Sequence, residues 1–288
     1  MRTILPTFIS IACLLACGCR KSPPAPAGPS PRIVSFSPAL TDILYDMGLG
    51  EHVVGITTFC QPPGGSRPPI VGDRGRVNAE AILAVRPDML LVQQNPEDFG
   101  ALRSLAPQVR IEYFEIETLA AVAAAVQRVG ELAGQPETAR ARRSEFEQKM
   151  QDLRSRLAGR EPVATLLVMD YERPSTGGAG TFIDEMITLA GGVNAAAARG
   201  YNGWKTLNRE NILAMAPQVL ICQVPSGQEA AAREYWQSLP SLPAVAAGRV
   251  HVVTDVRWTI PSLRSVDYAA ELAAMIHPGA FGEEQERE

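Results

Sequence analysis

Apolar runs of four to seven residues alternate with longer amphipathic stretches along most of this 288-residue chain. The short runs predict strands, and the longer stretches carry apolar residues at helical spacing and predict helices. The predicted strands are Arg32–Ser35, Val53–Thr57, Met89–Val92, Val109–Tyr113, Val163–Met169 and Val250–Thr254, and the predicted helices are Ala39–Met47, Phe99–Leu105, Leu119–Ala133, Phe182–Ala190, Ala230–Leu239 and Leu263–Ile276. Strands that alternate with helices in short units favour an α/β fold with parallel sheets.

One passage of this pattern occurs twice. Residues Val77–Val92 recur as Leu207–Cys222, and 7 of the 16 paired positions are identical. Each copy reads as an Asn at a helix start, a Glu two residues later, an apolar turn, a Pro that ends the helix and a short apolar strand. Because the shift of 130 residues is far longer than a solenoid repeat, the duplication indicates two similar lobes with a cleft between them.

A charged stretch separates the two copies. Gly134 ends one predicted helix, Pro136 fits the first turn of the next, and Gly159 stops it. Within this helix one narrow apolar stripe is formed by Phe146, Met150, Leu153 and Leu157. Roughly 22 residues at 1.5 Å each give about 33 Å, which is the right length to cross from one lobe to the other.

The sequence therefore predicts two α/β lobes with parallel-type sheets, joined by a single long interdomain helix. We expect an N-terminal lobe over residues 32–134, a linking helix over 135–159 and a C-terminal lobe over 160–288. About 250 residues are enough for two domains, each with its own core.

The first residues predict export from the cytoplasm. Arg2 precedes an apolar run that is too short to span a bilayer, so residues 1–16 have the form of a secretory signal peptide. The ending Leu-Leu-Ala-Cys resembles the lipobox of bacterial lipoproteins, which implies a lipid on Cys17, with Cys19 as the alternative. Residues 17–31 are rich in Pro and read as a tether. The expected location is the periplasm or the extracytoplasmic face, with the lipid as the only membrane anchor.

Composition excludes several classes of function. A net charge of −4 and a pI near 5.6 give no basic field for nucleic acid. Only Cys60 and Cys222 of the five cysteines lie in the body, too few for a disulfide framework. The two fall in different lobes, where a bridge would lock the cleft, so we expect none.

No catalytic motif is present in the sequence. The glycine-rich stretch Ser175–Gly180 lacks the Lys-Ser/Thr of a phosphate-binding loop and is interpreted as a flexible turn that opens the next helix. The body holds only His52, His251 and His277, whereas a zinc or manganese receptor needs several His and carboxylates that converge. A non-catalytic protein without a cofactor is therefore expected, and a metal-ion receptor remains an alternative.

Several segments, taken together and in order, resemble the helical-backbone substrate-binding proteins of ABC importers, in the branch that captures cobalamin, haem and ferric siderophores. These segments are Arg32–Thr41, Val53–Cys60, Val71–Gly72, Asn78–Val92, Gly180–Asn194 and Asn208–Ile221. The resemblance implies a monomer that holds a metal chelate between its lobes and delivers it to a dimeric permease. A surface lipoprotein that scavenges haem or corrinoids without transport is a further alternative.

The resemblance assigns Glu80 and Glu210, one in each copy of the repeat, to contact with arginines of the two permease subunits. A simpler interpretation needs no partner. Asn78 and Asn208 can cap their helices, and an acid in the first turn stabilises a helix by about 0.3–1 kcal/mol against its dipole. Equivalent corners of two similar lobes are nevertheless what a two-fold symmetric partner requires.

Ligand-binding residues are expected in the loops beyond the carboxyl ends of the strands. By this rule the candidates are Phe59, Cys60, Arg74, Gln93, Gln94, Tyr171, Glu172, Trp204, Arg257 and Trp258. Flat aromatic rings suit a corrin, a porphyrin or a catecholate, and an Arg suits an anionic chelate.

Individual positions point to different ligands within the resembled branch. Trp204 stands where the cobalamin binder has a cleft tryptophan, whereas Arg74 stands where the hydroxamate-siderophore binder has an arginine. A lone thiol such as Cys60 is typical of a small buried apolar residue. Relatives often carry an Arg-Pro-Gly-Pro-Arg turn where this chain has Ile260–Arg264, so a contact from that first Arg is not carried over. The choice between cobalamin, haem and a siderophore stays open.

Overall fold

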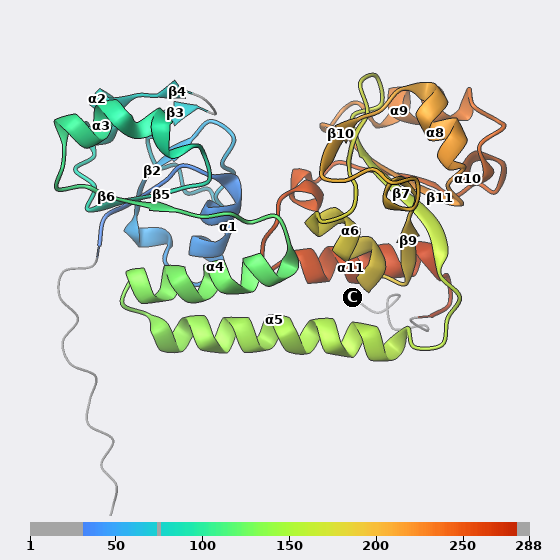
Figure 1. Ribbon diagram of the computed structural model, residues 1–288, viewed down its shortest axis with the longest axis horizontal. Helices are drawn as coiled ribbons and strands as arrows, with labels where there is room; N and C mark the ends of the chain where they lie inside the picture. Colours follow the sequence, from blue (N-terminus) through green and yellow to red (C-terminus); the bar gives the residue numbers. More distant parts are fainter. Residues whose placement is uncertain (1–30, 74–75, 281–288) are drawn as a thin grey trace, which may run out of the picture.

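The computed structural model describes residues 31–73 and 76–280. Figure 1 shows two α/β lobes side by side, with one long helix running beneath both. The predicted two-lobed α/β fold is thus confirmed. The predicted signal peptide, Cys17, almost all of the tether and Arg74 lie outside the described residues.

The N-terminal lobe contains one sheet with the strand order β4-β3-β2-β1-β5-β6. Neighbouring strands run parallel, apart from the antiparallel pair β3 and β4. Its strands are β1 (Ile33–Ser35), β2 (Val53–Thr57), β3 (Ile70–Asp73), β4 (Arg76–Val77), β5 (Met89–Val92) and β6 (Arg110–Tyr113). Parallel strands place their carboxyl ends, and hence the loops that follow them, at one edge of the sheet.

Helices cover both faces of this sheet. The first helix begins where Ser37 accepts a hydrogen bond from the backbone N–H of Leu40 and Pro38 occupies the first turn. The helices of the lobe are α1 (Pro38–Asp46), α2 (Ala79–Ala84), α3 (Gly100–Leu105) and α4 (Leu119–Leu132), with 3-10 turns η1 (Gly50–His52) and η2 (Pro96–Phe99).

The C-terminal lobe repeats this design around the order β10-β8-β7-β11-β12, with β9 paired to β7. The central strands run parallel, whereas β8 and β10 are antiparallel. Its strands are β7 (Val163–Met169), β8 (Ser175–Gly177), β9 (Gly192–Asn194), β10 (Trp204–Thr206), β11 (Val219–Gln223) and β12 (Val250–Val253). Its helices are α6 (Phe182–Leu189), α7 (Ala195–Ala198), α8 (Arg209–Met215), α9 (Glu229–Gln237), α10 (Pro243–Ala246) and α11 (Ser265–Ile276), with the 3-10 turn η3 (Val256–Thr259).

The sequence repeat forms the same unit in both lobes. Asn78 caps α2 and Asn208 caps α8, each accepting a hydrogen bond from the backbone N–H three residues on, as predicted. The two helices also end alike, because Arg86 and Ala216, 130 residues apart, both adopt φ of 47°. Each precedes a Pro, which disfavours continuation of the helix.

The glycine-rich stretch after β7 differs from its prediction as a flexible turn. Ser175–Gly177 forms β8, which pairs with β10, so half of the stretch belongs to the sheet. Strands of three residues carry too little apolar periodicity to be found from sequence, and β9 and β10 were missed for the same reason. The turn itself follows at Gly180, whose φ of +80° favours glycine.

Helix α5 (Pro136–Arg156) is the helix that joins the lobes. The predicted apolar stripe is buried: Phe146, Met150, Leu153 and Leu157 are each less than a tenth exposed. This stripe belongs to one continuous hydrophobic cluster that contains Leu40 of the N-terminal lobe and Leu272 of the C-terminal lobe. The two lobes therefore share a core. Within the described residues, no helix is both long and apolar enough to cross a membrane.

Candidate functional site

Segments of the two lobes are joined by direct cross-lobe hydrogen bonds, and we call the residues that make these contacts the lobe junction. The guanidinium of Arg257, after β12, donates to the backbone oxygen of Gln61, after β2, at 3.0 Å. The indole N–H of Trp204 donates to Oε2 of Glu117, after β6, at 2.9 Å. Strand ends thus bring together three of the segments that the sequence places at a ligand site.

Two cross-lobe hydrogen bonds, the one from Trp204 to Glu117 and a further one to Glu185, lie at the start of helix α4. Glu117 lies just before the helix, and Oε2 of Glu185 on α6 accepts a hydrogen bond from the backbone N–H of Leu119 at 2.5 Å. A carboxylate at a helix N-terminus is stabilised by the unpaired backbone N–H groups and the helix dipole. Carboxylates from both lobes therefore lie around this end of α4.

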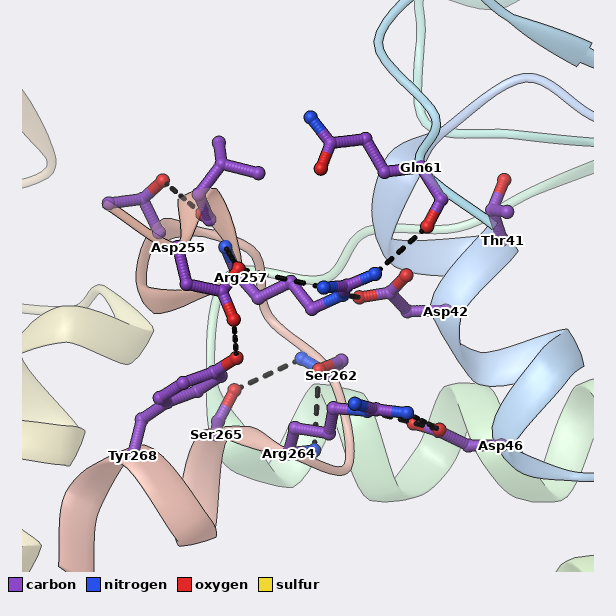
Figure 2. A network of polar contacts seen from close by, with 12 residues as sticks. Thr41, Asp42, Asp46, Gln61, Asp255, Arg257, Ser262, Arg264, Ser265 and Tyr268 are labelled. Atoms are coloured by element: carbon purple, nitrogen blue, oxygen red, sulfur yellow. Dashed lines mark hydrogen bonds and ion pairs between the residues drawn. The ribbon is translucent and has the colours of Figure 1, made fainter. Parts of the chain in front are cut away.

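Arg257 is the centre of the polar network drawn in Figure 2. Its Nε lies 3.6 Å from Oδ2 of Asp42 on α1, and its Nη1 lies 3.6 Å from Oδ1 of Asp255. With the hydrogen bond to Gln61, the guanidinium has partners in both lobes, and its side chain is 20% exposed. The predicted ligand residue thus already has partners within the protein.

Asp42 is an unusual residue for the buried face of a helix. Its side chain is only 6% exposed, and Oδ2 makes no hydrogen bond within the described residues. Burial raises the pKa of this carboxyl from 3.8 to about 6, an effect that the nearby Arg257 partly opposes. One helical turn later, Asp46 forms an ion pair with Arg264 at 3.2 Å, and burial raises its pKa as well.

The segment that carries Arg257 is held by its own lobe. Asp255 caps η3 by accepting a hydrogen bond from the backbone N–H of Arg257 at 3.0 Å. The hydroxyl of Tyr268 on α11 donates to the other oxygen of Asp255 at 2.5 Å. Burial and this bond raise the pKa of Tyr268. The carboxylate beside Arg257 is therefore fixed from two sides.

Two aromatic side chains remain exposed among the candidates. Trp204 is 42% exposed, with its ring 5.7 Å from that of Phe182, and Phe59 on the N-terminal lobe is 56% exposed. Tyr171 is half-buried against Tyr235, with ring centroids 5.7 Å apart. Exposed rings from both lobes are compatible with stacking on a flat ligand.

Burial corrects the predictions for Trp258 and Cys60. Trp258 is 2% exposed and packs against Tyr268 with ring centroids 5.2 Å apart. Cys60 is 7% exposed and lies 3.2 Å from the hydroxyl of Thr57. Neither offers a surface to a ligand in this structure, because the 3-10 turn and the end of β2 direct them into the core. The thiols of Cys60 and Cys222 are both free and buried.

The remaining candidates form hydrogen bonds within their own lobe. The amide of Gln94 donates to the backbone oxygen of Phe36 at 2.8 Å, and Gln93 accepts a hydrogen bond from Ser37. Both glutamines are half-buried and join the loop after β5 to the loop after β1. Glu172 is exposed, and its backbone N–H donates to Asp170.

Sequence reasoning missed Asp42, Asp46, Glu117 and Glu185. A usable signal existed for the first two, since they are the only charges in an otherwise apolar helix and are four residues apart, on one face. Charged residues inside an apolar helical pattern point to a partner elsewhere in the chain. Among the described residues, no group of three or more His, Cys, Asp and Glu is placed to hold a metal ion.

The two glutamates of the repeat are exposed in the first turns of α2 and α8. These helices lie on the upper side of their lobes in Figure 1, away from α5. The two helices that carry Glu80 and Glu210 thus share a side of the molecule.

The sequence profile of the periplasmic binding protein family matches residues 33–256. The chain belongs to this family. Proteins of this family are substrate-binding transport proteins, and membership implies a periplasmic location.

This periplasmic binding protein is similar to proteins with named ligands, and the solved ones share its fold. A vitamin B12-binding protein of Yersinia pestis (strain Pestoides F) is 26% identical over 223 residues, which cover 77% of this chain and 79% of the relative. The vitamin B12-binding protein BtuF of Vibrio cholerae is 25% identical with a TM-score of 0.73, covering 88% of this chain and 99% of that one. The apo haem-binding protein RhuT of Roseiflexus sp. RS-1, 24% identical with a TM-score of 0.74, covers 88% and 100% and shows the same fold.

The buried carboxyl of Asp42 predicts a pH-dependent stability. Its pKa is raised from 3.8 to about 6 in the folded state, so its proton stabilises the fold below pH 3.8, and this stabilisation is lost as the pH rises through 6. We expect the melting temperature of the wild type, relative to Asp42→Asn, to fall between pH 4 and pH 8. A shift of about two pKa units corresponds to about 3 kcal/mol.

The matched control for this comparison is Asp267→Asn, because Asp267 is 53% exposed and pairs with Lys149. Its melting temperature relative to the wild type is expected to stay constant over the same pH range. A difference between wild type and Asp42→Asn that does not change with pH would contradict the assignment.

Proposed function

We propose that this periplasmic binding protein is the receptor of an ABC importer and captures a metal chelate, either a corrinoid, haem or a ferric siderophore, at the lobe junction. The observation that carries the proposal is the pair of exposed rings, Phe59 and Trp204, contributed by opposite lobes: Phe59 lies two residues before Gln61, and Trp204 donates to Glu117. An exposed aromatic ring on each lobe suits a large flat ligand, because each ring buries a large apolar area on contact. The ligands of the B12-binding and haem-binding relatives support this class of ligand.

The shared core supports a receptor that binds without wide opening of its lobes. Because α5 and the cluster around Phe146 join both lobes, separating them would expose apolar area at roughly 25 cal/mol per Å². Recognition then depends mainly on side chains and loops at the junction.

We extend the proposal to delivery and anchoring. Glu80 and Glu210, exposed on one side of the two lobes, would each meet a basic side chain on one subunit of a dimeric permease. A lipid on Cys17 would hold the monomer at the extracytoplasmic membrane surface, with residues 17–31 as the tether.

The proposed ligand class predicts that the purified protein binds at least one of cyanocobalamin, haemin and a ferric hydroxamate siderophore with micromolar or tighter affinity. Trp204→Ala should weaken that binding about tenfold, because a stacking face is lost. Isothermal titration calorimetry measures the affinity of the wild type and of Trp204→Ala for each ligand. Leu105→Ala is the control, since Leu105 is an exposed apolar side chain on α3, at 66%. Absence of binding across the panel would overturn the ligand class, and an unaffected Trp204→Ala would remove the junction as its site.

Docking through the glutamates predicts a selective transport defect. The double variant Glu80→Ala, Glu210→Ala should retain ligand affinity but lose uptake in cells and binding to permease-containing membranes, because a charge pair at such a contact can contribute a few kcal/mol. A purely local role predicts instead a stability loss of about 1 kcal/mol per site with normal uptake. Uptake of labelled ligand and thermal melting distinguish the docking role from the local role.

Anchoring predicts that Cys17→Ala moves the protein from the membrane fraction to the soluble periplasmic fraction, since the thioether to the lipid cannot form. Cys19→Ala is the matched control and should remain in the membrane fraction. Fractionation followed by immunoblotting reads both variants, and release by Cys19→Ala alone would place the lipid on the other cysteine.

A further inference from the structure

The arginines that bridge the lobe junction are already paired with carboxylates of the protein. Arg257 lies between Asp42 and Asp255 and also donates to the backbone of Gln61. Arg264 is paired with Asp46. Figure 2 shows both guanidiniums pointing at carboxylates of α1. Each cation therefore already faces a carboxylate of the protein, which offsets part of its attraction for a carboxylate of a ligand.

Acidic groups outnumber basic ones among the described side chains that make the cross-lobe contacts named above or pair with Arg257. The carboxylates are Asp42, Asp46, Glu117, Glu185 and Asp255, and the cations are Arg257 and Arg264. Lys205 is next to Trp204 but points to the opposite face of β10, because successive side chains in a strand alternate. Arg74 lies outside the described residues, so the comparison concerns the described part of the chain. A surplus of negative charge repels an anionic ligand and attracts hydrogen-bond donors.

We propose that Asp42 and Asp255 set the charge selectivity of the lobe junction: by occupying Arg257, they make the site accept a metal chelate whose periphery carries amides and reject the same ring with free carboxylates. The inference rests on the proposed function, because it takes the lobe junction as the ligand site. Two features make the selectivity durable. Asp42 is buried, and Asp255 is fixed by the hydroxyl of Tyr268 and by the N–H of Arg257, so Asp255 cannot turn away from the guanidinium without loss of these two hydrogen bonds, and the buried side chain of Asp42 has no solvent to turn into.

The surplus acids supply the acceptors that such a periphery needs. Glu117 is exposed, and only one of its oxygens accepts the indole N–H of Trp204. A carboxylate has about four acceptor positions, so this group can also accept amide N–H donors from a ligand that stacks on the tryptophan. A ligand carboxylate at the same place would face Glu117 as a like charge, and this repulsion disfavours its binding.

Two matched ligand pairs test the inference on the full-length mature protein. The first is dicyanocobinamide, which carries peripheral amides, against dicyanocobyrinic acid, which carries carboxylates on the same ring. The second is haemin dimethyl ester against haemin. Competition titration should give about tenfold or tighter binding for the uncharged periphery within the pair that binds. Raising the salt concentration should reduce the difference in affinity between the two forms of a pair, because screening weakens the repulsion between the carboxylates of ligand and protein.

Asp42→Asn should reduce the preference for the uncharged periphery, measured as the ratio of the two dissociation constants, several-fold. The reason is that Arg257 can then pair with a ligand carboxylate. Asp267→Asn, a charge removal on the exposed face of α11, should keep the wild-type ratio. Asp255→Asn repeats the test on the other carboxylate beside Arg257. The preference of the wild type is measured without any variant, so the experiment remains decisive even if Asp42→Asn folds poorly.

Equal or tighter binding of the carboxylate forms, or an unchanged preference in folded Asp42→Asn and Asp255→Asn, would overturn the selectivity while the proposed function stands. Failure of all four ligands to bind would overturn the proposed function and this inference with it.

Discussion

The apolar stripe of α5 is the constraint on which the rest of this structure depends. Phe146, Met150 and Leu153 are buried in a cluster that reaches from α1 to α11, so the helix does more than connect two independent units. Burial of each such side chain contributes roughly 1.5–3 kcal/mol, and the contributions are lost together if a lobe moves away from the helix. Helices α4 and α5 approach each other closely, since a Cβ on Gly130 would come within 2.2 Å of the Cβ of Ala139. Any larger residue at Gly130 would force the helices apart.

Once the lobes are fixed on α5, polar groups at their junction must find partners across it. Asp42 and Asp46 lie on an otherwise apolar helix, and burial of their charges is unfavourable unless it is offset. Arg257 and Arg264, more than 200 residues further along the chain, offset part of that cost. The pairs thus serve two purposes: they make the burial of α1 tolerable, and they leave the junction with arginines that are neutralised in advance.

The fold by itself does not determine the ligand. The B12-binding and haem-binding relatives superpose on this chain with nearly the same TM-scores, 0.73 and 0.74. Their common scaffold is therefore compatible with ligands of different peripheral chemistry, and under the proposed function discrimination comes from the side chains at the junction. In this chain the relevant side chains are the exposed rings of Phe59 and Trp204 and the acids that surround Arg257.

The sequence by itself determined the features that depend on neighbours along the chain. The bounds of β2, β5 and β7, the caps at Asn78 and Asn208 and the buried stripe of α5 follow from periodicity, capping chemistry and the repeat, all of which act within a few residues. Only the tertiary structure decided that Trp258 is buried, that Arg257 is paired and that Asp42 faces it. The hydrogen bond from Arg257 to Gln61 spans 196 residues and that from Arg264 to Asp46 spans 218, so these contacts exist only after the shared core has set the two lobes against each other.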